Sequence, residues 1–177
     1  MTGRPINAVI VVLHAGGLTW YVKRSERMAN YPGVWSLPSR QYDPATFADP
    51  NDLVRAQEIV DALSAERLGG VDLRVSRFLT EGSSDMNPMG VDVTLRLYEV
   101  DLCPEPVLDP DFYVGSEWMS PVRYQEASAG QPCGLCVRLW SDHAWLSGLS
   151  DRPYVATPEA SMEGIGPKND EDHEVSA

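Results

Sequence analysis

Basic residues are scarce in this chain. Its 177 residues hold 14 Lys and Arg against 26 Asp and Glu, which gives a formal net charge of −12. Proteins that bind duplex nucleic acid without sequence preference need a basic face, so no nucleic-acid partner is expected. A small phosphorylated ligand is compatible with this composition, because a few local cations or metal ions suffice to hold it.

Long apolar runs are also absent from the sequence. The longest, residues 8–13, has six residues, whereas a membrane-spanning helix needs about 20. Residues 1–7 carry one Arg and no cleavage-like segment. We therefore expect no signal peptide, no membrane partner and a cytoplasmic location.

Cysteines are few, and they occur at positions 103, 133 and 136. Cys133 and Cys136 form a CxxC pair, but a zinc site would need a second pair or nearby histidines, and only His143 is close in sequence. A redox pair of the thioredoxin kind lies in a βαβ unit, a context that the surrounding sequence lacks. The pattern favours two ordinary cysteines at the start of a helix.

Hydrophobic periodicity predicts two helices and a set of short strands. The first helix is expected over residues 50–68, with Asp49 as its N-cap, Pro50 at its first position and Gly69 at its end. The second helix is expected over residues 137–149. Strands are predicted at residues 7–14, 18–23, 34–37, 71–81, 90–102 and 117–119.

This order of elements predicts one α+β domain over residues 1–155. The expected architecture is an α/β/α sandwich, in which a mixed central sheet lies between the two helices, one on each face. Residues 156–177 contain six acids and one Lys, with Pro, Gly and no periodicity. Such a segment buries too little apolar surface to offset the entropy of ordering, so we expect a disordered acidic tail outside the core.

The segment PGVWSLP, residues 32–38, follows a predicted strand and Arg24. This stretch resembles the strand and loop that lead into the Nudix box of the Nudix hydrolases. Two later segments are similar to family segments in the same order. ERLGGV at residues 66–71 resembles the end of the box, and SEWMSP at residues 116–121 resembles a segment that closes the substrate side. The resemblance runs from residue 6 to residue 149.

The resemblance implies hydrolysis of a nucleoside diphosphate linked to another moiety, with Mg²⁺ or Mn²⁺ held by glutamates on one helix face. The box of this chain is degenerate. Ser39 and Arg40 stand where the family has two loop glycines, and aligning back from Gly69 places Glu66 and Arg67 at the final pair of glutamates. One metal ligand of the helix remains in that register.

A second register assigns the acids of the box to Glu58 and Asp61. At about 100° per residue these two lie about 60° apart and can share a helix face, whereas Glu66 lies about 80° from Glu58 on the other side. The candidate catalytic and metal-binding residues are therefore Glu58, Asp61 and Glu66, helped by Asp43 or Glu81 from outside the helix. The alternative is that the helix acids are solvated residues of an amphipathic helix.

Arg24 and Arg40 are the candidate phosphate-binding residues, because the guanidinium fork matches phosphate oxygens. Their alternative role is a surface ion pair with Glu26 or Asp43.

Two functional hypotheses follow from these residues. The leading one is a divergent Nudix-type protein that binds a nucleoside diphosphate-linked or related phosphorylated metabolite, with Tyr31 and Trp35 as aromatic contacts, and that hydrolyses it if a divalent metal is held. The alternative is a catalytically inactive module that acts as a ligand sensor or protein-interaction domain; a homodimer is compatible with both. Acids that converge beside Arg24 and Arg40 would favour the first. Since at most two acids share a helix face, we expect weak or absent turnover.

Overall fold

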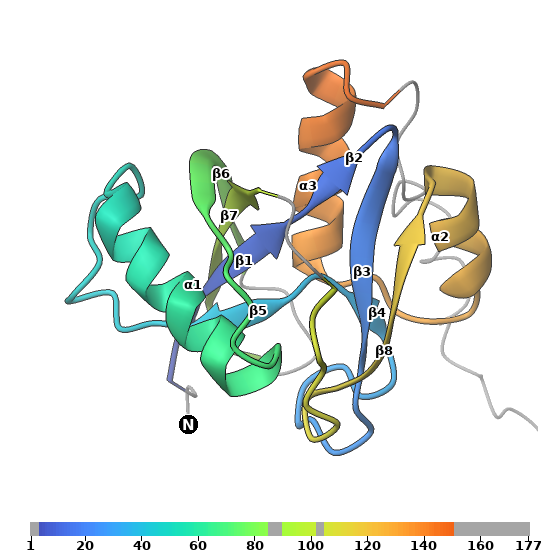
Figure 1. Cartoon of the computed structure of the whole chain (residues 1–177), viewed down its shortest axis with the longest axis horizontal. Helices are drawn as coiled ribbons and strands as arrows, with labels where there is room; N and C mark the ends of the chain where they lie inside the picture. Colours follow the sequence, from blue (N-terminus) through green and yellow to red (C-terminus); the bar gives the residue numbers. More distant parts are fainter. Residues whose placement is uncertain (1–3, 85–89, 102–104, 151–177) are drawn as a thin grey trace, which may run out of the picture.

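The computed structural model describes residues 4–84, 90–101 and 105–150 of the chain (Figure 1). The predicted tail, residues 156–177, and Cys103 lie outside the described residues. In order, the described elements are β1 (Ile6–Val12), β2 (His14–Ala15), β3 (Leu18–Arg24), β4 (Trp35–Ser36), β5 (Ser39–Gln41), α1 (Leu53–Arg67), β6 (Val75–Ser84), β7 (Val93–Val100), β8 (Tyr113–Met119), α2 (Pro121–Ala127) and α3 (Leu135–Leu146).

Two four-stranded sheets form the middle of the described domain. The first has the order β5-β1-β7-β6, in which β1 and β7 run parallel and the other pairs are antiparallel. The predicted mixed sheet is thus confirmed. In the second sheet β3 is central and pairs antiparallel with β2, β4 and β8. The sequence predicts a single sheet; the long-range pairing of β3 with β8 creates the second one.

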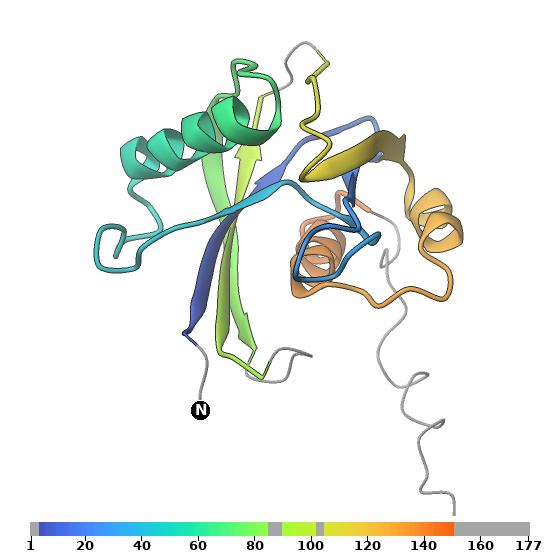
Figure 2. The same ribbon diagram turned by 90° about the horizontal axis from the view of Figure 1, so that it is seen from below.

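Strand β1 separates two hydrophobic clusters. Val9 and Val11 belong to the cluster that contains α1, whereas Ala8, Ile10 and Val12 belong to the cluster that contains α3. Because successive side chains of a strand point to opposite faces of the sheet, α1 and α3 must cover opposite faces, as Figure 2 shows. The predicted placement of the two helices is confirmed.

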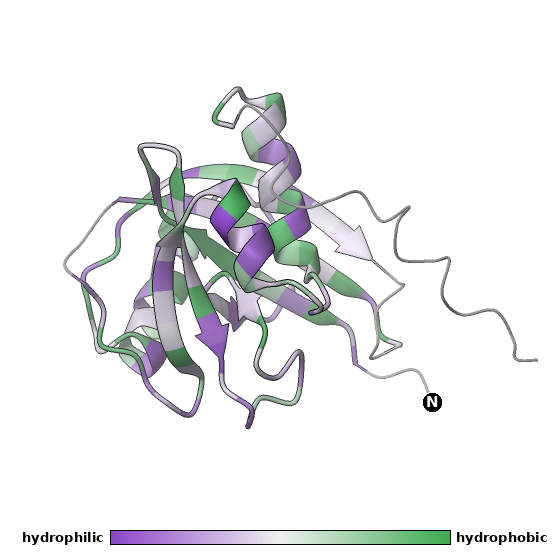
Figure 3. Ribbon diagram, turned by 90° about the vertical axis from the view of Figure 1, so that its right-hand side faces the viewer, coloured by the Kyte–Doolittle hydropathy of each residue, from purple (hydrophilic) through white to green (hydrophobic). Residues whose placement is uncertain are grey.

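Each of these helices buries one face. Hydropathy colouring shows green strands in the middle of the molecule and helices that carry both colours (Figure 3). Trp140 of α3 is fully buried and its Nε1 donates a hydrogen bond to Thr19 Oγ1 at 3.0 Å, which ties α3 to β3. No helix in the described ranges is both long and apolar enough to cross a membrane. The buried apolar residues of the two helices are Ala56, Ile59, Val60 and Leu63 of α1, and Cys136, Val137, Trp140 and Ala144 of α3.

Helix α1 begins later than predicted. Its N-cap is Asp52, whose carboxylate accepts a hydrogen bond from the backbone N–H of Arg55 at 3.0 Å. Asp49 accepts from the backbone N–H of Asn51 at 2.9 Å and closes a turn that precedes the helix. The prediction of Asp49 as the N-cap is therefore wrong, because both acids are good capping residues and only the three-dimensional turn decides between them.

The chain after residue 109 carries more regular structure than predicted. β8 covers Tyr113–Met119, where the sequence predicts a strand over residues 117–119. Gly115 weakens the strand signal in this stretch, and pairing with β3 overrides it. α2, Pro121–Ala127, is absent from the prediction, although Ser120 before a proline is a capping signal.

Candidate functional site

Glu58 and Asp61 lie on the exposed surface of α1. Glu58 forms an ion pair with Arg55, one turn before it. Asp61 accepts a hydrogen bond from the Gln57 amide at 2.7 Å, and the same amide donates to the carbonyl of Leu73 at 2.7 Å. Both acids thus have partners within the local structure, and neither is among the described residues that line the arginine-rich cavity described below.

Glu66 and Arg40 lie together. Arg40 Nε donates to Glu66 Oε2 at 3.0 Å, which joins β5 to the last turn of α1. Of the two roles predicted for Arg40, phosphate contact or an ion pair with a nearby acid, the structure forms an ion pair, but with Glu66. Asp43 accepts from the backbone N–H of Ala45 at 3.0 Å and closes a turn.

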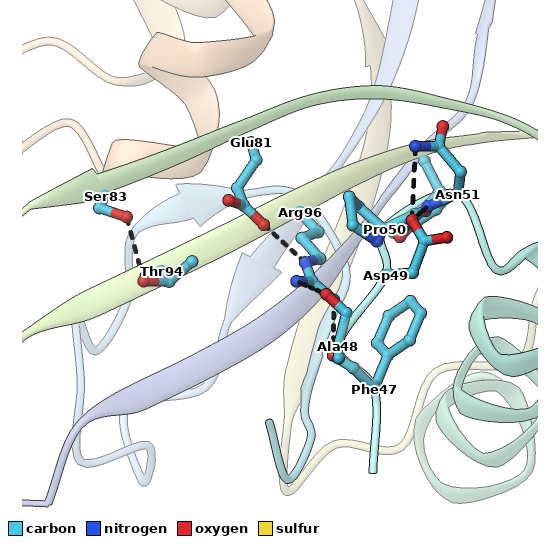
Figure 4. A network of polar contacts seen from close by, with 10 residues as sticks. Phe47, Ala48, Asp49, Pro50, Asn51, Glu81, Ser83, Thr94 and Arg96 are labelled. Carbon is cyan, nitrogen blue, oxygen red and sulfur yellow. Dashed lines mark hydrogen bonds and ion pairs between the residues drawn. The ribbon is translucent and has the colours of Figure 1, made fainter. Parts of the chain in front are cut away.

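Glu81 is the partner of Arg96. Arg96 is 8% exposed, and its Nε donates to Glu81 Oε2 at 2.6 Å. Its other two nitrogens donate to the carbonyls of Phe47 at 2.8 Å and Ala48 at 2.9 Å. Figure 4 shows this network between the sheet and the segment that precedes α1. Glu81 therefore positions the Arg96 side chain, and the hydrogen bonds of Arg96 hold residues 43–52 against the sheet.

These carboxylates do not assemble into a metal site. In the part of the chain that the structure describes, no three Asp, Glu, His or Cys side chains could together hold one ion. Mg²⁺ and Mn²⁺ prefer several hard oxygen ligands, so the donor set does not fit either ion. The side chains best suited to bind a ligand lie instead around a cavity.

A cavity of about 370 Å³ lies between the first sheet, the start of α3 and the segment that joins β3 to β5. Ile6, Ala8 and Ile10 of β1 line it, together with Val93 and Leu95 of β7. All five belong to the cluster on the α3 side of the sheet or pack against it. The cavity is thus a continuation of the α3-side core, with an apolar floor.

Arginines make up the charged lining of this cavity. Of the 14 Lys and Arg in a chain of net charge −12, five arginines line the cavity. Asp111 is the one carboxylate among the described lining residues. The local charge is therefore opposite in sign to the charge of the whole chain. The five are Arg24, Arg27, Arg40, Arg67 and Arg138.

Three of the five arginines lie within ion-pair distance of an acid, and two of them also form a hydrogen bond with it. Arg27 pairs with Asp111 at 2.6 Å, and both side chains are exposed. Arg40 pairs with Glu66 as described above. Exposed ion pairs contribute only about 0–1 kcal/mol to stability, so these two arginines can exchange their partner for a ligand at little cost.

Arg24, at the end of β3, is partly buried. Its Nε donates to the carbonyl of Asn30 at 2.9 Å, and among the described residues no acid forms an ion pair with it. Burial lowers the pKa of the Arg24 guanidinium below its ordinary value, and the positive charge of Arg67 lowers it further. The alternative role of Arg24, an ion pair with Glu26 or Asp43, is thus not formed.

Arg67 and Arg138 each bury a nitrogen that has no hydrogen-bond partner among the described residues. The Nε atoms of both are buried, and neither finds a hydrogen-bond acceptor within the described chain. Arg67 Nη1 donates to the carbonyl of Ser39 at 2.9 Å, and its guanidinium carbon lies 4.1 Å from the ring centre of Phe112. Glu66 Oε2 is 4.0 Å from Arg67 Nε and is already bonded to another arginine.

Tyr31 and Trp35 lie in different surroundings. Tyr31 lines the cavity with a φ of 49°, in the left-handed region that a tyrosine rarely adopts. Burial raises the pKa of Tyr31, and the charge of Arg138 partly opposes this. Trp35 of β4 packs against the α3-side cluster and is not among the described lining residues.

Cys133 and Cys136 lie at the start of α3, as the sequence predicts, and both are free thiols. Cys136 is buried, lines the cavity and lies 3.4 Å from Ser36 Oγ. Burial, together with the nearby Cys136, raises the pKa of Cys133 to about 11. Because redox exchange and zinc binding need the thiolate, this environment favours the structural role.

No protein-family model matches the chain, and no curated protein matches it in sequence. Solved structures do match. A MutT Nudix hydrolase from Burkholderia pseudomallei superimposes with a TM-score of 0.56, over 77% of this chain and 95% of its own, at 19% identity. A Nudix hydrolase from Nitrosomonas europaea gives 0.55 over 85% and 93%, at 15% identity. The Nudix domain of Shewanella oneidensis NrtR, complexed with ADP-ribose, gives 0.53 over 84% and 90%, at 16% identity.

The chain has the Nudix fold. For the fold, the resemblance carried by PGVWSLP is therefore confirmed. Within this Nudix fold the last turn of α1 supplies Arg67 to the cavity, at a position that the box alignment from Gly69 assigns to a glutamate. That alignment is the only sequence signal for Arg67. Arg138 has none, because it reaches the cavity through the packing of α3 on the sheet.

Proposed function

We propose that the protein binds a small phosphorylated metabolite in the arginine-lined cavity. The observation that carries this proposal is the gathering of five arginines around one cavity in a chain of net charge −12. Arg guanidiniums match phosphate oxygens through two parallel hydrogen bonds. Since like charges repel, such a cluster is explained best by an anion that it receives.

The lining favours a ligand with an anionic part and an apolar or aromatic part. The apolar floor of β1 and β7 offers side chains without hydrogen-bonding groups, whereas the arginines offer many donors. Long polyanions are disfavoured because the rest of the chain is acidic. ADP-ribose, which the Nudix domain of NrtR binds, combines a diphosphate with ring systems and is the first probe we propose.

Hydrolysis of the ligand is the alternative function, and the fold favours it because two of the relatives above are named Nudix hydrolases. It would need Mg²⁺ or Mn²⁺ at the predicted ligands Glu58, Asp61, Glu66 and Asp43, each of which now has another partner. A fold by itself does not fix activity. We therefore propose binding as the main function, with weak or absent turnover.

The test of binding is isothermal titration calorimetry of the full chain with ADP-ribose and a UDP-sugar. We expect Arg138→Met to weaken binding at least about tenfold, since a hydrogen bond to a charged group contributes about 1.5–3 kcal/mol. Arg74→Met removes an exposed arginine outside the cavity and is the matched control. Equal affinities of both variants, or no binding by the folded wild type, would refute the proposal.

The test of hydrolysis is release of phosphate or nucleotide from the same probes with Mg²⁺ or Mn²⁺. Three variants, Glu58→Gln, Asp61→Asn and Glu66→Gln, separate the two registers of the box. Robust turnover that Glu66→Gln abolishes would establish the alternative function and the register that ends at Gly69. Turnover lost with Glu58→Gln and Asp61→Asn would establish the other register.

A further inference from the structure

Among the described residues, three guanidiniums line the cavity without a hydrogen bond to an acid: Arg24, Arg67 and Arg138. Glu66 lies 4.0 Å from Arg67 but is hydrogen-bonded to Arg40. All three line the same cavity; the charge of Arg67 lowers the pKa of Arg24, and the charges of Arg138 and Arg24 both lower the pKa of Tyr31, against the effect of its burial. The Nε atoms of Arg67 and Arg138 are buried without a partner in the described residues. Burying charges and donors without partners costs free energy. The free protein thus holds an arrangement that an anion stabilises.

The acids beside the cavity are already engaged. Asp111 pairs with Arg27 and Glu66 pairs with Arg40. A divalent cation placed here would add positive charge to Arg24, Arg67 and Arg138, and it would find no set of three ligands among the described residues. Electrostatics therefore oppose a metal ion at the place where they favour a phosphate.

We propose that Arg24, Arg67 and Arg138 bind the phosphate groups of the ligand directly, without a divalent cation between protein and ligand. This inference rests on the proposed function and specifies its chemistry. Three guanidinium charges are sufficient to neutralise the two negative charges of a diphosphate bridge. They also supply the donors that such oxygens accept. The box alignment agrees, because Arg67 stands where an acidic metal ligand is expected.

The decisive experiment compares ADP-ribose binding by the full chain in EDTA and in millimolar Mg²⁺, by calorimetry. We expect the two affinities to agree within a factor of about three. Binding in Mg²⁺ alone would refute direct recognition and leave the proposed function standing. If neither ADP-ribose nor inorganic pyrophosphate binds in either buffer, both proposals are refuted.

A second experiment separates the charge of Arg67 from its fork geometry. In EDTA, Arg67→Gln should weaken ADP-ribose binding about 10- to 100-fold, and Arg67→Lys, which keeps the charge, should bind with an intermediate affinity. Arg55→Gln, on the exposed side of the same helix and paired with Glu58, is the matched control. Unchanged affinity of Arg67→Gln, with its fold confirmed by circular dichroism, would contradict the assignment.

A third experiment measures metal binding directly. Titration of Mn²⁺ into the protein without ligand, followed by electron paramagnetic resonance, should leave the signal of free Mn²⁺ undiminished. A stoichiometric loss of that signal, abolished by Glu66→Gln, would show that the acid beside the cavity holds a metal and would overturn the inference.

Discussion

The substitution Gly69→Ala should destabilise the protein more than Gly70→Ala. Both glycines follow α1 with a φ of 73°, in the left-handed region. A Cβ at position 69 would lie 2.9 Å from Val107 Cβ and 3.0 Å from the Val107 carbonyl oxygen, whereas a Cβ at position 70 would have no atom within 4 Å. Comparing the two substitutions therefore separates the cost of backbone strain, which both share, from the cost of the steric clash, which only Gly69→Ala has.

The magnitudes follow from these contacts. A non-glycine residue in the left-handed region costs about 1–2 kcal/mol, and this applies to both variants. Overpacking adds about 1–3 kcal/mol for Gly69→Ala alone. The segment that carries Val107 cannot move away freely, because the backbone N–H of Asp109 donates to the carbonyl of Arg67 at 3.0 Å. We expect losses of about 1–2 kcal/mol for Gly70→Ala and about 2–5 kcal/mol for Gly69→Ala.

The assay is urea denaturation followed by tryptophan fluorescence, with ADP-ribose titration of each folded variant. Gly69→Ala should also weaken binding, since the segment it displaces carries Phe112, on which the Arg67 guanidinium lies. Gly70→Ala should leave affinity unchanged. Equal destabilisation by both substitutions would refute the packing argument. Unchanged affinity of Gly69→Ala for ADP-ribose would show that the position of Phe112 does not affect ligand binding.

Two further outcomes are expected. Arg96→Met should lower the free energy of unfolding by about 3 kcal/mol, because it leaves Glu81 and two loop carbonyls without their donor; a loss below about 1 kcal/mol in urea denaturation would show that other contacts hold residues 43–52. Cys133, with its pKa raised to about 11 by burial and by Cys136, should react with iodoacetamide at pH 8 about 100-fold more slowly than in the urea-unfolded chain. Rapid labelling of the native protein, located by peptide mass spectrometry, would contradict that environment.

The sequence predicts those parts of the fold that depend on local pattern. α1 and α3 carry helical periodicity, and β1 is a continuous apolar run, so their existence and their opposite faces could be predicted. The pairing of β3 with β8 could not, because it joins residues far apart in the chain and includes Gly115, a weak strand former. Helix starts depend on which of two capping acids the preceding turn selects, as at Asp49 and Asp52.

The candidate site also contains some residues that the sequence could predict and others that it could not. Arg24, Arg40 and Tyr31, which lie in or beside the PGVWSLP loop, line the cavity, and their role in binding stays a prediction. Helical spacing places Glu58 and Asp61 on one side of α1, but spacing does not show which partners they take. Arg138 lies outside any motif, and packing of α3 alone brings it to the cavity.

The alternation of side chains along β1 allows ligand preference and stability to change separately. Ile6, Ala8 and Ile10 line the cavity, while Val9 and Val11 on the opposite face of the strand belong to the α1-side core. A larger residue in place of Ala8 would reduce the space open to a ligand while α1 kept its contacts with the other face. If the proposed function holds, sequence changes at alternate positions of this strand would change which metabolite the cavity accepts while the rest of the domain stayed the same.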